Sequence, residues 1–150
     1  MRAVALDLEA VLGDTGPLWD AWVEDASRRS REVLALPRER TAAAAALDVR
    51  LGNWRVLLER FAEERAPVYL RPRAAVNAAL RSLRASDVRL GGFTDAPAEL
   101  ARVALAQLGA GRLLDLVECG AGALELLLAE LGPDTAVIRS REALLALATE

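Results

Sequence analysis

The 150-residue chain contains no histidine, no lysine and only one cysteine, Cys119. Without an imidazole or an ammonium side chain it can form neither a serine–histidine nucleophile nor a Schiff base, and histidine-ligated zinc is excluded as well. Cys119 has no partner for a disulfide within the chain and no companions for a metal site. We expect Cys119 to be a small, buried side chain at the end of a strand.

Long apolar runs and a strong charge of one sign are also missing. Hydrophobic residues make up 53% of the chain, but no stretch is apolar for long enough to span a bilayer. The net charge of -3 is too small to argue for nucleic acid or an anionic membrane as a partner. With no basic-then-apolar signal segment, we expect a cytoplasmic protein. The alanine-rich and arginine-rich composition indicates a bacterium with a high GC content.

What the sequence does contain is an alternation of short apolar runs with helical patterns. The apolar runs predict strands at 2–6, 88–93, 113–118 and 134–138. Apolar residues at helical spacing predict helices at 73–85, 97–108, 123–131 and from 142 onward. This order predicts a mainly parallel sheet between two layers of helices, a three-layer α/β fold of the Rossmann-like type.

Residues 17–66 carry three helical patterns and no strand pattern. We therefore predict an α/β core made of residues 1–15 and 86–150, interrupted by a helical insert with its connector at 16–85. The insert holds all three tryptophans, Trp19, Trp22 and Trp54. Burial between the insert helices is the first interpretation. The alternative is an aromatic surface for a partner or a homodimer, with Trp19 as the best candidate for exposure.

Acidic side chains gather where strands end. Asp7 and Glu9 follow the first strand, and Thr94 and Asp95 follow the second. The carboxyl ends of parallel strands meet at one edge of a sheet, where open α/β folds keep their active sites. Several carboxylates at one edge repel each other and need a cation. Our hypothesis is that Arg139, after the fourth strand, is an internal counter-ion for Asp7, because guanidinium pairs well with carboxylate.

The segment RAVALDLEAVLGDT, residues 2–15, resembles the nucleophile motif of the haloacid dehalogenase (HAD) superfamily. In that family an apolar strand is followed by Asp-x-Asp-Gly-Thr-Leu-x-Asp-Thr. This chain matches at Asp7, Leu12, Asp14 and Thr15, whereas residues 9–11 read Glu-Ala-Val where the family has Asp-Gly-Thr. The order of elements is similar to the phosphoglycolate phosphatase-like branch, which carries a small helical cap after this motif.

The resemblance implies a role for each strand-end residue. Asp7 would be the nucleophile and a Mg²⁺ ligand, and Glu9 would be the general acid and base. Thr94, together with Asp95, would bind a phosphoryl oxygen. Glu9 is one methylene longer than the family's Asp, and a misplacement of ~1 Å can cost ~100-fold in rate. A helix N-cap is the alternative interpretation of Thr94 and Asp95.

Two further family motifs are changed in charge. The family's Lys after the third strand has no counterpart, since residues 113–138 contain neither Lys nor Arg. Arg139 stands where the family has a metal-binding Asp, and Glu142 is the nearest remaining acid. This change removes an anion and adds a cation beside a divalent ion that prefers carboxylate ligands, so we do not expect a Mg²⁺ site to survive it.

Two functions follow from these observations. The first is a HAD-like hydrolase-fold pseudoenzyme without a cofactor, which acts by binding an unknown protein partner or a small phosphorylated molecule. The alternative is a Mg²⁺-dependent phosphatase of small phosphorylated metabolites, with an aspartyl-phosphate on Asp7 and the metal held by Asp7 and Asp95 or Glu142. A receiver-like phospho-acceptor also uses strand-end acids, but it needs a Lys that this chain lacks. The apolar insert helices offer a surface for a homodimer.

Overall fold

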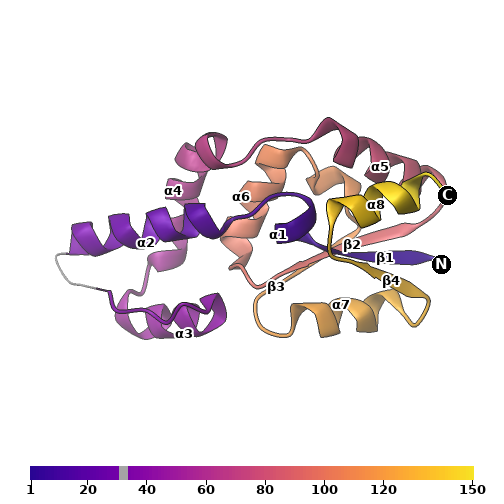
Figure 1. Cartoon of the computed structure of the whole chain (residues 1–150). Coiled ribbons are helices and arrows are strands. Elements are labelled where there is room, and N and C mark those ends of the chain that lie inside the picture. Colours follow the sequence, from indigo (N-terminus) through magenta and orange to yellow (C-terminus); the bar gives the residue numbers. More distant parts are fainter. Residues whose placement is uncertain (31–33) are drawn as a thin grey trace.

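The computed structural model describes residues 1–30 and 34–150. Within them one parallel sheet, of order β3-β2-β1-β4, is formed by the strands β1 (Ala3–Asp7), β2 (Arg89–Thr94), β3 (Leu116–Cys119) and β4 (Thr135–Ile138) (Figure 1). The predicted strands are confirmed to within a few residues. The third begins later than predicted because the 3-10 turn η1 (Gly111–Leu113) occupies the start of its apolar run.

Helices cover both faces of the sheet, as the predicted three-layer fold requires. Helix α7 (Ala123–Leu131) lies on one face, and α5 (Ala74–Ala85) and α8 (Arg141–Ala148) lie side by side on the other (Figure 1). A small core between α7 and the sheet contains Ala3, Ala5, Phe93, Ala123, Leu127 and Leu131. The α/β, Rossmann-like fold class is therefore confirmed.

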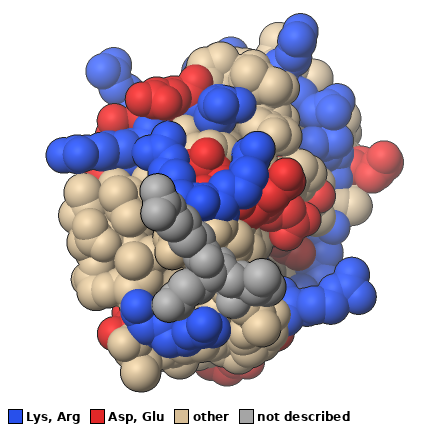
Figure 2. All heavy atoms as spheres, turned by 90° about the vertical axis from the view of Figure 1, so that its left-hand side faces the viewer, with Lys and Arg blue, Asp and Glu red and all other residues tan. Residues whose placement is uncertain are grey.

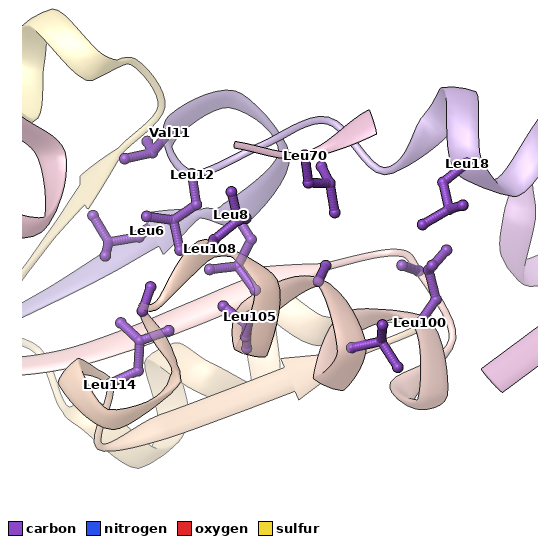
Figure 3. Close-up of a cluster of buried hydrophobic side chains, with 14 of the residues drawn as sticks. Leu6, Leu8, Val11, Leu12, Leu18, Leu70, Leu100, Leu105, Leu108 and Leu114 are labelled. Carbon is purple, nitrogen blue, oxygen red and sulfur yellow. The ribbon is translucent and has the colours of Figure 1, made fainter. Parts of the chain in front are cut away.

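The larger core lies on the opposite face and extends into the insert. Its centre is formed by the short helix α1 (Leu8–Val11) and by α6 (Ala98–Leu108), which follows β2. Figure 3 shows Leu8 and Leu12 close to Leu105 and Leu108 from α6. These contacts anchor the chain immediately after β1, so the acidic residues between the buried leucines are held at the edge of the sheet.

Two glycines in β2 allow helices to approach the sheet closely on both faces. A Cβ atom on Gly91 would lie 2.6 Å from Cδ1 of Leu127 in α7. A Cβ atom on Gly92 would overlap the side chain of Leu8 in α1. Both glycines are buried, and a methyl group on either would force the neighbouring leucine to move.

The insert consists of α2 (Gly16–Ser30), α3 (Arg40–Arg50) and α4 (Trp54–Tyr69). Trp19, Trp22 and Trp54 are all buried, which confirms the core interpretation. The alternative, an aromatic surface with Trp19 as the best candidate for exposure, is wrong for Trp19, since only 5% of this residue is accessible. Its ring lies 5.4 Å from that of Trp22 and 6.3 Å from that of Trp54 because α2 packs against α4.

Helix α4 continues through Pro67, where the sequence predicted its end. Pro67 lies in the last turn, and the bond from Leu70 N to Ala66 O, 2.8 Å long, closes the helix beyond it. The missing N–H deprives only the carbonyl of Glu63, an exposed residue that water can reach. The predicted boundary of the insert at residue 85 stays a prediction. No helix within residues 1–30 and 34–150 has the length and apolar character needed to cross a membrane.

The close approach at Gly92 gives a stability prediction. We expect Gly92→Ala to destabilise the fold by about 1–3 kcal/mol, because the added methyl group forces Leu8 out of its position against the sheet. Urea unfolding measures the change. The matched control is Gly52→Ala, where an added Cβ meets no atom within 4 Å and the unfolding midpoint should hold or rise slightly. Equal midpoints for Gly92→Ala and the natural chain would contradict the packing argument.

Candidate functional site

Glu9 lies one turn beyond β1 and is bound by Thr15 at the end of the same loop. The backbone N–H of Thr15 donates to Glu9 Oε2 at 3.2 Å, and the Thr15 hydroxyl donates to Glu9 Oε1. Thr15 is buried, and Glu9 is half-buried. The loop that begins after β1 is therefore closed on itself through the carboxylate that the resemblance assigns to acid–base chemistry.

Arg40, from the first turn of α3 in the insert, completes this cluster. Its Nη2 donates to Glu9 Oε1 and to Asp95 Oδ1, the latter at 2.7 Å, and its Nη1 donates to Thr15 Oγ1 at 2.6 Å. Arg40 is only 8% exposed, which is unusual for an arginine unless its charge is paired. We call Glu9, Thr15, Arg40 and Asp95 the guanidinium cluster.

The charges within the guanidinium cluster stabilise each other. Burial alone would lower the pKa of Arg40, but the hydrogen bonds from Arg40 to Asp95 and Glu9, together with the charges of these carboxylates, raise that pKa above its usual value. Arg40 is therefore a permanent cation at this edge of the sheet. A single guanidinium neutralises acids that follow two different strands.

Asp7, at the end of β1, acts as the N-cap of α1. Its Oδ1 accepts hydrogen bonds from the N–H groups of Glu9 at 3.2 Å and Ala10 at 3.4 Å. The half-buried Asp7 lies opposite Phe93 in the β1–β2 register. The cap starts helix α1 directly after the strand.

Thr94 and Asp95 diverge at the end of β2. Thr94 is buried, and its hydroxyl accepts a hydrogen bond from Ala96 N at 3.1 Å. Asp95 is exposed and points to Arg40. Neither residue is the N-cap of α6, because Pro97 occupies that position. The alternative N-cap interpretation is therefore wrong, and the phosphate-binding roles of Thr94 and Asp95 stay predictions.

The structure does not pair Arg139 with Asp7. Among the described residues no ion pair joins them; Arg139 is exposed, and its guanidinium carbon lies 5.5 Å from the centre of the Phe93 ring. The neighbouring Arg141 donates from Nε to Val11 O at 3.0 Å and so ties α8 to α1. The hypothesis named Asp7 as the partner of Arg139, whereas the structure pairs Arg40 with Glu9 and Asp95 and shows no ion pair of Asp7 within the described residues.

The residues at this edge do not fit a Mg²⁺ ion. Glu9 and Asp95 already bind Arg40, Asp7 caps α1, and Glu142 is an exposed residue in the first turn of α8. Within the described part of the chain, no three Asp, Glu, Cys or His side chains converge as a metal site would require. Mg²⁺ needs several oxygen ligands in near-octahedral arrangement, and a guanidinium within the acid cluster repels it.

Cys119 ends the edge strand β3 and is half-buried. Burial, with smaller contributions from the charges of Glu118 and Glu99, raises the pKa of its thiol to about 11. Cys119 lies at the end of a strand, as the sequence predicted. Because its pKa is raised, the thiol is not activated as a nucleophile.

Comparison with known proteins identifies the fold. No family model matches the sequence, and no curated protein matches it. The structure is similar to that of a "putative beta-phosphoglucomutase" from Thermotoga maritima, with a TM-score of 0.59 and 20% sequence identity over 99% of this chain and 82% of that chain. The likeness shows that the two chains share a fold, and it supports the HAD-like architecture that the order of motifs predicted. The phosphoglycolate phosphatase-like branch stays a prediction.

Removal of Arg40 should destabilise the chain more than removal of an exposed arginine. We expect Arg40→Met to cost roughly 1–3 kcal/mol, below the ~3–5 kcal/mol of a fully buried pair because Asp95 is half exposed. The control is Arg102→Met, which breaks an exposed pair with Glu59 and should cost less than about 1 kcal/mol. Chemical denaturation measures the free energy of unfolding of both variants. Equal losses of stability would mean that Arg40 is not a buried, paired cation.

The raised pKa of Cys119 predicts slow alkylation. At pH 8 a pKa near 11 leaves about 100-fold less thiolate than the ordinary value of 9.0 does, and the greater nucleophilicity of a basic thiolate recovers about tenfold of this. Iodoacetamide should therefore modify the folded chain about tenfold more slowly than the urea-unfolded chain. The rate in the folded chain should keep rising as the pH approaches 11, since thiolate forms above the pKa. Equal rates in both states would contradict the burial of the thiol.

Proposed function

We propose that this HAD-fold chain acts by binding a protein partner or a small phosphorylated molecule, and that it is not an efficient metal-dependent phosphohydrolase. The observation that carries the proposal is the guanidinium of Arg40, which is bound to Glu9 and Asp95 at the edge where the resemblance expects catalysis. Phosphoryl transfer at this edge would need a free general acid and a cation that neutralises the phosphate.

A general acid must be free to give up and recover a proton. The carboxylate of Glu9 receives hydrogen bonds from the Thr15 backbone, the Thr15 hydroxyl and Arg40. Both carboxylate oxygens are therefore already occupied by donors of this chain, whereas an acid catalyst needs an oxygen that can reach the leaving group of a substrate. Glu9 is therefore better suited to holding a cation than to transferring a proton.

A nucleophilic carboxylate must also approach an anionic phosphate. Catalysis of this step relies mainly on positioning and on neutralisation of charge. The charge of Arg40 is already balanced by Glu9 and Asp95, and Asp7 has no bound cation among its hydrogen-bond partners in the described residues. A phosphate at Asp7 would meet repulsion that the chain does not offset.

The surface of the insert supports contacts of mixed charge. Figure 2, which views the molecule from the insert side, shows basic and acidic side chains next to one another, with no wide field of one sign. Exposed pairs such as Arg29–Asp25 at 3.0 Å illustrate the pattern. Such a surface favours a protein or a small molecule over nucleic acid.

Magnesium titration by calorimetry, combined with turnover of p-nitrophenyl phosphate, tests the proposal on the purified chain. We expect no saturable Mg²⁺ binding and no turnover beyond that of Asp7→Asn. Arg139→Asp places a carboxylate at the position of the family's metal ligand, but it leaves Arg40 bound to Glu9 and Asp95, so we expect no saturable Mg²⁺ binding in this variant either.

Opposite results would establish the alternative function. Mg²⁺-dependent turnover in the natural chain that disappears in Asp7→Asn would identify a phosphatase that works through an aspartyl-phosphate on Asp7. Thermal unfolding of each variant serves as the control, since loss of the fold would abolish turnover for a trivial reason.

A further inference from the structure

We propose that Glu9, Thr15 and Asp95 form a guanidinium-binding site and that Arg40, bound in this site, latches α3 over the carboxyl edge of the sheet. The inference deepens the proposed binding function, on which it rests. It assigns a ligand class to this edge, a planar guanidinium, in place of the divalent cation that the fold family implies and that these residues do not fit.

The site is built from directional acceptors. Arg40 uses three of its nitrogens: Nη2 donates to both carboxylates, Nη1 donates to Thr15, and Nε donates to Asp95 Oδ2 at 3.5 Å. The two donors to Asp95 reach its two oxygens, which is the forked pairing that a guanidinium makes and an ammonium does not. The acceptors follow β1 and β2, so the sheet itself sets their spacing.

Helix α3 has few other attachments. In contrast to α2 and α4, it does not run closely along any other helix or strand within the described residues. Its other anchors are the side chains of Ala43, Ala44 and Leu47 in the larger core, a hydrogen bond of 2.8 Å from Trp54 Nε1 to Asp48, and an ion pair of 3.8 Å between Arg55 and Asp48. Within the described residues, Arg40 is the residue of α3 that forms ion pairs with the acids at the edge of the sheet.

Other ion pairs between the insert and the core join a different helix and are exposed. Arg102 meets Glu59 at 2.7 Å and Arg55 meets Glu99 at 3.0 Å, which links α6 to α4. The arginine side chains of these pairs are 63% and 44% accessible, against 9% for Arg40. Exposed pairs contribute little, so the position of α3 depends on Arg40 and that of α4 does not.

Hydrogen exchange measured by mass spectrometry tests the latch. In Arg40→Ala we expect the amides of α3 to exchange at least about tenfold faster than in the natural chain, while α4 keeps its protection. Arg102→Ala, which breaks an exposed pair on α4, should leave exchange in α3 unchanged. Asp95→Asn provides a milder variant that removes one acceptor charge and should raise exchange in α3 by a smaller factor.

Chemical rescue tests the site. Ethylguanidinium at millimolar concentration should restore part of the lost thermal stability of Arg40→Ala, because it fills the vacated acceptors, and it should leave exchange in α3 fast, because it is not tethered to α3. Ethylammonium, which lacks the planar fork, should not rescue. Arg102→Ala should respond to neither compound.

Two results would overturn the inference. Unchanged exchange of α3 in both Arg40→Ala and Asp95→Asn would remove the latch. Equal effects of ethylguanidinium on Arg40→Ala and Arg102→Ala, or equal effects of ethylammonium, would remove the site. None of these measurements depends on catalysis, so Mg²⁺-dependent turnover in the natural chain would contradict the proposed function without deciding the latch.

Discussion

The buried guanidinium of Arg40 is the interaction on which the arrangement of this molecule depends. Glu9 and Asp95, which follow separate strands, face one edge of the sheet, and both form ion pairs with this guanidinium. Arg40 reaches them from the insert, and it also bonds the hydroxyl of Thr15, which closes the loop after β1. Removal of Arg40 from this position would leave a half-buried Glu9 beside Asp95 and would remove the ion pairs that join α3 to the edge of the sheet. Arg40 therefore both balances the charges of Glu9 and Asp95 and positions α3.

A guanidinium is a different cation from a metal ion, and this difference governs the chemistry of the edge. A divalent ion keeps open coordination positions, so it can bind carboxylates and a phosphoryl oxygen at the same time. In contrast, the Nε, Nη1 and Nη2 groups of Arg40 already donate hydrogen bonds to Asp95, Thr15 and Glu9. Arg40 therefore neutralises the two acids and leaves few donor groups free to bind a substrate. The acids at this edge lie where open α/β folds have their active sites, but Arg40 of the same chain already neutralises Glu9 and Asp95.

The sequence predicted the strands, the three layers and the order of motifs, because these depend on local apolar patterns and on the topology of parallel sheets. It also predicted that the strand-end acids need an arginine. It did not identify Arg40, which is 31 residues from Glu9 and 55 from Asp95 and lies in the polar run Arg38-Glu39-Arg40-Thr41, like any exposed helix start. Arg139, adjacent to a strand end, was the nearer candidate by topology. A contact between an insert and a distant strand end produces no periodic pattern in the sequence, so the sequence alone did not predict it.

The segment from Asp7 to Thr15 shows how packing fixes the chemistry. Leu8 fits against Gly92, where no side chain intervenes, and Val11 and Leu12 are buried in the same core. Asp7 and Glu9 alternate with these anchors, so each carboxylate is directed by the burial of its neighbours. Helix α1 begins directly after the Asp7 cap, and Glu9 in its first turn accepts a hydrogen bond from the backbone N–H of Thr15. The longer side chain of Glu9 then reaches Thr15 and the incoming Arg40 together. Of the positions at which this motif departs from the family pattern, Glu9 is the one that contacts the guanidinium of Arg40.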